Sequence, residues 1–89
     1  MKPIHLTRHA RVRAAMRGAT EGEVRETVLR GNREPARRGK WQARWRFALR
    51  GGPEREEGCT AKTVEVVFAD EAEALVVVTV KVYYAREGA

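Results

Sequence analysis

The hydrophobic period of this chain changes just after Gly31, and this change restricts the fold class more than any other feature. In residues 40–50, KWQARWRFALR, the odd-numbered positions are apolar and the even-numbered positions are polar except for Ala48. Such alternation is typical of a strand with one buried face. Before Gly31, apolar residues recur at helical spacing between capping residues. Helices followed by strands predict an α+β domain.

Two helices are predicted, over about residues 7–17 and 20–30. The hydroxyl of Thr7 can cap the first helix, and Gly18 can end it. The second helix begins with Thr20 and Glu23 at the spacing of a capping box. Because only two residues separate the helices, we expect a short αα-hairpin.

Three strands are predicted, over about residues 40–50, 63–69 and 74–84. Ile4 and Leu6 indicate a short strand or extended arm, and residues 32–38 can add a strand only at an edge, because Pro35 has no amide hydrogen. Connections of hairpin length require antiparallel pairing. The expected fold is a single domain over residues 1–89, with the αα-hairpin packed on one face of a three- to four-stranded antiparallel sheet.

The length of 89 residues is that of one domain. The longest apolar run, residues 74–78, is far shorter than the ~18–20 residues of a membrane span, and residues 1–13 lack the apolar segment of a secretory signal. The single cysteine, Cys59, cannot form an internal disulfide, and no Cys/His pattern predicts a metal site. We therefore expect a cytoplasmic domain without membrane segment, metal or cofactor.

The positive charge is concentrated in the N-terminal half of the chain. Residues 1–50 carry 14 basic and 4 acidic side chains, whereas residues 51–89 carry 4 and 8. Arginine supplies 14 of the 18 cations, and its guanidinium group pairs with phosphate oxygens through two parallel hydrogen bonds. This distribution indicates RNA or another polyanion as a partner. The alternative is compositional bias, since an Arg- and Ala-rich chain without serine is also typical of a biased, thermophilic genome.

One face of the predicted sheet is apolar and the other is basic. The basic face is expected to carry Lys40, Gln42, Arg44, Arg46 and Arg50, joined by Thr63, Glu65, Thr79, Lys81 and Tyr83 if the registers agree. Arg44 and Arg46 leave one face about 6.6 Å apart, close to the spacing of successive phosphates, and are candidate phosphate-binding residues. Lys81 and Tyr83 could polarise a phosphodiester, or they could simply end an amphipathic strand.

His9, Arg13 and Arg17 share one side of the first helix, because they follow one another at intervals of four residues. Positive neighbours favour a neutral imidazole, which can act as a general base, while Arg13 and Arg17 could hold a phosphate. The alternative is a structural histidine that lies beside a buried Val12–Met16 stripe and donates to a backbone carbonyl.

Residues 4–31, IHLTRHARVRAAMRGATEGEVRETVLRG, contain a motif with fixed spacing. A Thr-x-His-Ala sequence is followed by an arginine four residues after the histidine, and by Arg-Gly ahead of the capped second helix. These positions are Thr7, His9, Ala10, Arg13, Arg17, Gly18 and Thr20. Together with the β-branched segment LVVVTVKVYYA at residues 75–85, the motif resembles the bacterial domain of unknown function 4258 family.

This resemblance implies a relationship to the small α+β toxins of the RelE and BrnT type, which cleave RNA without a metal. On this hypothesis the protein is an RNA-directed, metal-independent endoribonuclease with His9 as base and Tyr83 or Lys81 as acid, and its partner is a small acidic antitoxin-like protein. The chain departs from RelE-type toxins because it lacks a convincing C-terminal catalytic set. The alternative is a non-catalytic interaction protein that binds an acidic partner or forms a homodimer through an open sheet edge.

Overall fold

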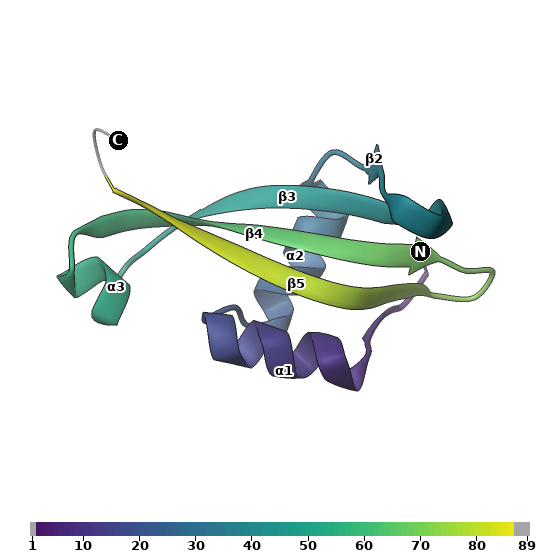
Figure 1. The fold of residues 1–89 in the computed structure, drawn as a ribbon, viewed down its shortest axis with the longest axis horizontal. Helices are drawn as coiled ribbons and strands as arrows, with labels where there is room; N and C mark the ends of the chain where they lie inside the picture. The colour runs from purple at the N-terminus through teal and green to yellow at the C-terminus, as the bar shows by residue number, and fades with distance from the viewer. Residues whose placement is uncertain (1, 87–89) are drawn as a thin grey trace.

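The two longest strands lie side by side in one sheet. The computed structural model describes residues 2–86, in which β4 (Cys59–Asp70) pairs antiparallel with β5 (Leu75–Arg86) and with β3 (Trp41–Ala48) (Figure 1). The short strands β1 (Ile4–Leu6) and β2 (Glu34–Pro35) complete the order β1-β5-β4-β3-β2. The helices and the sheet confirm the α+β class.

The sheet is mixed rather than wholly antiparallel. β1 runs parallel to β5, and the Leu75 amide donates to the Pro3 carbonyl at 2.9 Å while the Thr7 amide donates to the Val77 carbonyl at 3.0 Å. The expected antiparallel sheet of three or four strands is therefore wrong in its strand number and in the direction of this edge. The rule for short connections does not apply to β1, since both long helices, β3 and β4 separate it from β5 in the chain.

The strand boundaries differ from the predicted ones where a charged residue or a bulge breaks the alternation. β4 begins at Cys59 rather than at residue 63. Lys62 faces the helices and is buried, because its ammonium group donates to the Gly18 carbonyl at 2.6 Å and to Glu23 Oε1 at 2.8 Å. A register shift between Cys59 and Ala61 adds to the irregularity. β3 is shorter than predicted and ends at Ala48.

The structure has two long helices, α1 (Arg8–Arg17) and α2 (Glu21–Arg30). The Thr7 hydroxyl accepts a hydrogen bond from an amide in the first turn of α1 at 3.1 Å, and Gly18 ends this helix in the left-handed conformation. Thr20 and Glu23 form both hydrogen bonds of a capping box, at 2.9 and 3.0 Å. Local capping signals therefore predicted both helices correctly.

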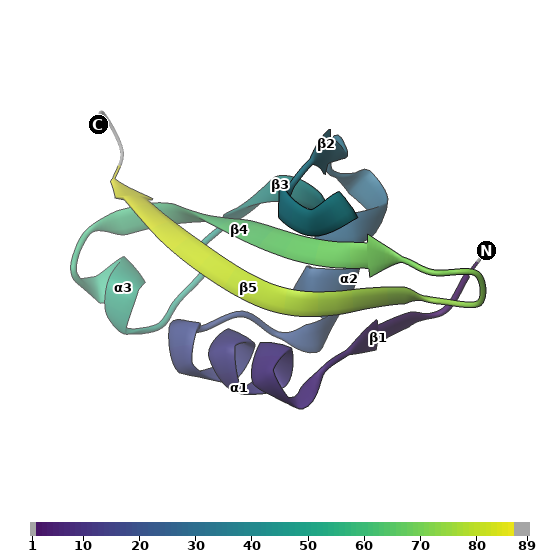
Figure 2. The same ribbon diagram turned by 45° about the vertical axis from the view of Figure 1, so that its right-hand side comes forward.

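Each long helix packs on the sheet rather than along the other helix. In Figures 1 and 2, α1 runs beside β5 and α2 crosses behind β3 and β4. The expectation that the helices pack as an αα-hairpin is therefore wrong. Ala10 and Ala14 are buried against the strand, whereas Val12 and Met16 are exposed. The predicted Val12–Met16 stripe is not in the core, because the small alanine side chains let α1 approach β5 most closely.

The hydrophobic core lies between the helices and the helix-facing side of the central strands. Its fully buried side chains include Val24 of α2, Val64, Val66 and Phe68 of β4, and Val77 and Val80 of β5. The short helix α3 (Pro53–Glu56) and a 3-10 turn (Arg37–Gly39) lie in the connections on either side of β3. No helix within residues 2–86 is long and apolar enough to cross a membrane.

Candidate nucleic-acid interface

Among residues 2–86, no α-helix covers one side of the sheet, and we call this side the open face. Figure 1 views the molecule from the open face, with α2 behind the strands. The strand registers arrange its residues in three cross-strand rows, which are Gln42–Val67–Thr79, Arg44–Glu65–Lys81 and Arg46–Thr63–Tyr83. This register agrees with the one expected from the alternating pattern. It brings the candidate site residues Arg44, Arg46, Lys81 and Tyr83 onto one surface.

Arg44 is already bound to a carboxylate in the middle row. Its Nε lies 2.6 Å from Glu65 Oε2, and the Glu65 side chain is only 8% exposed. The Arg44 side chain remains 65% exposed, so its terminal nitrogens still face solvent. Glu65 therefore neutralises one arginine of the open face, while Lys81 at the other end of the row forms no ion pair within residues 2–86.

The third row combines a free cation with an exposed aromatic ring. Arg46 is exposed and makes no ion pair in the described part of the chain. Tyr83 is 52% exposed and lies across Thr63 from Arg46. Tyr83 also lines a shallow hollow together with Arg44 and Thr63. This row therefore presents an unpaired guanidinium group and an exposed aromatic ring on the same surface.

Tyr84 points to the opposite side of the sheet from Tyr83. Its hydroxyl donates to the Arg17 carbonyl at 2.6 Å, at the end of α1. Burial, followed by the negative charge of nearby Glu54, raises the pKa of Tyr84. Tyr84 thus stays protonated at neutral pH and joins α1 to β5, which leaves Tyr83 as the tyrosine available to a ligand.

A larger hollow lies at the end of the open face next to the 3-10 turn. The cationic side chains of Arg37, Arg38, Lys40 and Lys81 line it. Gln42, Val67 and Thr79, which form the first cross-strand row, also line it. Its volume is about 860 Å³. We call this feature the cationic hollow.

Arg50 does not join the open face as the alternating pattern predicted. β3 ends at Ala48, so the alternation does not extend to residue 50. Arg50 instead lines a hollow with Glu23, Glu26 and Lys62, which belong to α2 and to the helix-facing side of β4. The basic surface is therefore shorter than expected at the C-terminal end of β3.

The predicted helix residues His9, Arg13 and Arg17 lie on α1. His9 is exposed and makes no side-chain hydrogen bond within residues 2–86, so the predicted alternative of a histidine donating to a backbone carbonyl is absent from this part of the chain. Arg13 is half-buried. Arg17 is also half-buried, and its guanidinium group donates to the Val80 carbonyl of β5 at 2.9 Å. Arg17 therefore helps to hold α1 on the sheet.

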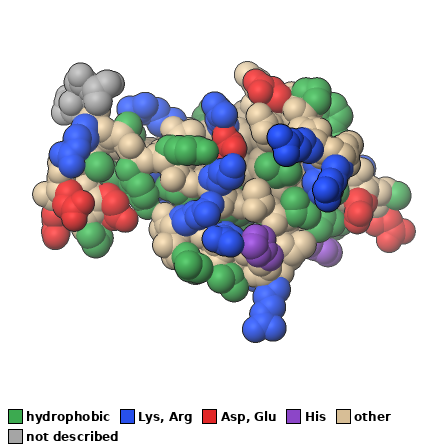
Figure 3. Space-filling model, viewed as in Figure 1, with side chains coloured by type: hydrophobic (Ala, Val, Ile, Leu, Met, Phe, Trp, Pro, Cys, Tyr) green, Lys and Arg blue, Asp and Glu red, His purple; other side chains and the backbone are tan. Residues whose placement is uncertain are grey.

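The structure separates the candidate residues into two groups. Arg44, Arg46, Lys81 and Tyr83 share the open face, while His9, Arg13 and Arg17 project from α1 beside β5. No hydrogen bond or ion pair among residues 2–86 joins His9 to Tyr83 or Lys81. Figure 3 shows Lys and Arg side chains along the middle of the open face and a histidine at its margin.

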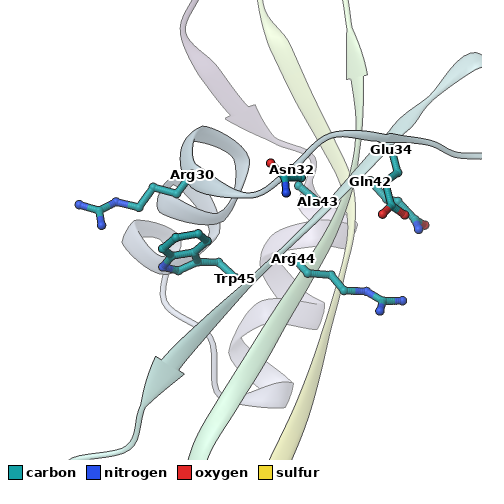
Figure 4. Close-up of a pocket in the computed structure, with 7 residues that line it drawn as sticks. All are labelled: Arg30, Asn32, Glu34, Gln42, Ala43, Arg44 and Trp45. Carbon is teal, nitrogen blue, oxygen red and sulfur yellow. The ribbon is translucent and has the colours of Figure 1, made fainter.

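The outer edge of β3 is a further feature of the sheet, and it is an open edge of the kind expected from the sequence. A hollow of about 260 Å³ lies at this edge. Figure 4 shows the residues that line it, with Arg30 and Trp45 on one side of the strand and Glu34, Gln42 and Arg44 on the other. The Arg30 guanidinium carbon lies 5.9 Å from the centre of the Trp45 ring, which is a cation–π contact. β2 pairs only with Trp41 and Gln42, so the rest of β3 has no strand beside this edge within residues 2–86.

Comparisons of the chain with protein-family models, curated proteins and solved structures find no match in any of the three. The resemblance to the domain of unknown function 4258 family therefore stays a prediction. Within the described range, no group of three or more His, Cys, Asp or Glu side chains is placed to hold a metal ion. The geometry and charge of the open face are consequently the features that bear on function.

Proposed function

We propose that this protein binds single-stranded RNA across its open face. The observation that carries the proposal is the row structure of this face, which sets Arg44, Arg46 and Lys81 beside the exposed ring of Tyr83. Cations that track a phosphate backbone and an aromatic ring that stacks on a base are the two parts of a single-strand binding surface. An exposed ring on the open face suits unpaired bases, because the bases of a duplex are already stacked on one another.

The spacing of the cations supports this proposal. Arg44 and Arg46 are two residues apart on β3, which corresponds to about 6.6 Å along a strand. Lys81 lies across the sheet on β5, so the positive charges extend over the width of the face as well as along it. The unpaired guanidinium group of Arg46 can bind one phosphate through two parallel hydrogen bonds, whereas Arg44 already uses its Nε toward Glu65. An extended RNA backbone could therefore contact several of these side chains at once.

RNA cleavage is a separate hypothesis with its own test. In a metal-independent reaction the ribose 2′-hydroxyl attacks the adjacent phosphorus, so a base and an acid must reach the same phosphate. Cleavage would require His9 on α1 to act together with Tyr83 or Lys81 on the open face. Incubation with total RNA in EDTA tests this: cleavage that disappears in His9→Ala supports the hypothesis, and intact RNA at high protein concentration contradicts it.

The salt dependence of RNA binding tests the main proposal. Fluorescence anisotropy with a labelled single-stranded RNA gives the slope of log K against log salt concentration, which is about 0.7 per phosphate contact. Replacing Arg46 and Lys81 together by glutamine should reduce the slope by about 1.4. The matched control replaces Arg8 and Arg55, two exposed cations on α1 and α3, by glutamine as well. This control should leave the slope unchanged. Equal slopes for the two double variants would contradict binding at the open face.

A second candidate function is suggested by the outer edge of β3. The Lys40 carbonyl accepts the Ala36 amide, so the even-numbered residues of β3 direct their backbone groups away from β4. Beyond Gln42 these groups pair with no strand within residues 2–86. Gly31 lies beside the Arg44 carbonyl, so the backbone groups of Arg46 and Ala48 are those that could pair with an extended segment of another protein. Arg44 and Arg46 favour an acidic segment, whereas a second copy paired antiparallel would bring arginines opposite one another.

The substitution Ala48→Pro separates this candidate from RNA binding. The Ala48 amide points to the outer edge, so proline there removes an edge donor without breaking the pairing with β4. Titration with a peptide of alternating glutamate and valine should shift the NMR signals of residues 44–48 in the parent protein but not in the variant. Absence of shifts in the parent protein would contradict strand addition, and size-exclusion chromatography with light scattering would reveal a homodimer.

A further inference from the structure

The cationic hollow differs from the rest of the open face in its concentration of unpaired charge. Arg37, Arg38, Lys40 and Lys81 line it, and none of them forms an ion pair within residues 2–86. Its one lining carboxylate, Glu65, is bound to Arg44. Four like charges around one hollow repel each other, so a bound anion of high charge would be strongly favoured there.

The shape and the remaining lining of the hollow suit a nucleotide. Its volume of about 860 Å³ lies in the range of ligand sites, which is roughly 300–1,000 Å³. Gln42 supplies an amide that can donate and accept, Thr79 supplies a hydroxyl, and Val67 between them supplies an apolar surface. The hollow also shares Lys81 with the row Arg44–Glu65–Lys81, so it is continuous with the proposed RNA-binding surface.

The loop that carries two of these cations is held in place by its own backbone. The Ala36 amide donates to the Lys40 carbonyl at 2.8 Å, and the Lys40 amide donates to the Arg37 carbonyl at 3.2 Å. Arg38 has φ of 59°, the left-handed conformation that residues with a Cβ atom disfavour. Its side chain is exposed, and burial therefore does not explain an arginine at this position. The guanidinium group of Arg38 is therefore accessible to a ligand.

We infer that the cationic hollow binds the terminal phosphate monoester of an RNA strand whose body crosses the open face. This inference rests on the proposed function. An internal phosphodiester carries one negative charge, whereas a terminal monoester with a second pKa of about 6 carries about −1.5 to −2 at neutral pH. The terminal group and its neighbouring diester therefore match a cluster of four cations better than an internal segment of the strand does.

The test compares RNA strands of one sequence that differ only at their ends. Three labelled oligonucleotides carry a 5′-phosphate, a 3′-phosphate or two hydroxyl ends, and their affinities are measured by anisotropy at one salt concentration, with the label attached to an internal base. One of the two phosphorylated strands should bind about tenfold more tightly than the hydroxyl-ended strand. Which one does so gives the polarity of the strand on the open face.

The variants Arg38→Gly and Arg37→Gln should reduce this preference to less than about twofold while hydroxyl-ended RNA binds as before. Glycine relieves the left-handed conformation at residue 38, so the first variant loses the charge without losing stability. Arg55→Gln changes the net charge equally at a distant site and should keep the preference. Equal affinity for all three strands would overturn the inference while leaving the proposed function intact. Failure of all three strands to bind would overturn both.

Discussion

Arg44 is a surface arginine whose removal would leave a buried carboxylate without its partner. Its Nε is the side-chain donor to Glu65, which is 6% exposed as a residue. Arg46, two residues along the same strand, has no such partner within residues 2–86. The sequence pattern assigned both arginines to the same face with equal roles, because alternation does not show which side chain is paired.

Arg44→Gln should therefore destabilise the protein by about 1–3 kcal/mol, because the buried carboxylate of Glu65 would lose the hydrogen-bond donor that offsets its desolvation. Arg46→Gln should change the free energy of unfolding by less than about 0.5 kcal/mol, as exposed substitutions usually do. Urea denaturation followed by circular dichroism measures both values. Equal stability of the two variants would show that the Arg44–Glu65 contact is not maintained in solution.

Glu23 makes the stability depend on pH. Burial acts to raise the pKa of Glu23, but hydrogen bonds from Lys62 and Thr20 outweigh it and hold the pKa below its ordinary value of 4.5. Because the folded-state pKa is the lower one, the contribution of Glu23 is present above pH 4.5 and is lost as the pH falls through the folded-state value. Asp70 acts in the same direction, because Lys2 and Arg33 donate hydrogen bonds that lower its pKa.

We expect Glu23→Gln to destabilise the protein by about 1–3 kcal/mol at pH 7, because the buried ammonium group of Lys62 then lacks its counter-charge. The stability difference between the parent protein and the variant should shrink as the pH falls from 5 to 3. Urea denaturation at several pH values measures this difference. A difference that stays constant over this range would contradict the ion pair between Lys62 and Glu23.

At the scale of elements, the close approach of α2 to β3 depends on Gly31. A Cβ atom at this residue would lie 2.7 Å from the Arg44 carbonyl oxygen and 3.0 Å from the Ala43 Cβ. The φ of Gly31 is −68°, so its backbone conformation suits any residue and space is the only constraint. The absence of a side chain at Gly31 therefore allows the C-terminal end of α2 to pack directly against β3, the strand that bears Arg44 and Arg46.

Gly31→Ala should accordingly destabilise the protein by about 1–3 kcal/mol, the usual cost of overpacking. The matched control is Gly22→Ala, within α2, where the nearest atom to a new Cβ is 3.8 Å away. This control should stabilise the protein by about 0.5–1 kcal/mol, because alanine is the better helix former. Thermal denaturation of both variants gives the comparison, and a neutral Gly31→Ala would show that α2 can shift away from β3.

The elements that the sequence predicted correctly are those defined by local signals. Thr7, Thr20 and Glu23 form the predicted caps, and the alternation in β3 gave the correct faces. The parallel pairing of β1 with β5 depends on contacts between residues about seventy positions apart, which no local pattern encodes. The orientation of α1 was also missed, because the close contact uses Ala10 and Ala14 rather than the larger apolar residues.

At the scale of the whole molecule, the proposed function depends on the separation of the two sheet faces. The helices cover one face and bury the apolar side chains, which leaves the other face to Arg44, Arg46, Lys81 and Tyr83 (Figures 1 and 3). The alternating pattern was enough to predict this surface. The cationic hollow could not be predicted, since it depends on the path of residues 35–40 beside the first cross-strand row.

The predicted catalytic residues are also divided between different parts of the structure. His9 was grouped with Lys81 and Tyr83 on chemical grounds, whereas the structure places His9 on α1 and the other two on the open face. A sequence indicates which side chains could act as base and acid, but their common access to one phosphate depends on tertiary packing. The open face therefore supports RNA binding more directly than it supports cleavage.

The most direct test of the central claim is an NMR titration of the protein with single-stranded RNA, which reports where the RNA lies. The largest shifts should fall on Arg46, Thr63, Lys81 and Tyr83 of the open face, and they should decrease as the salt concentration rises. The exposed helix residues Met16 and Leu29 should be unaffected. Shifts confined to α1, around His9 and Arg13, or no shifts at all would contradict the claim that the open face binds RNA.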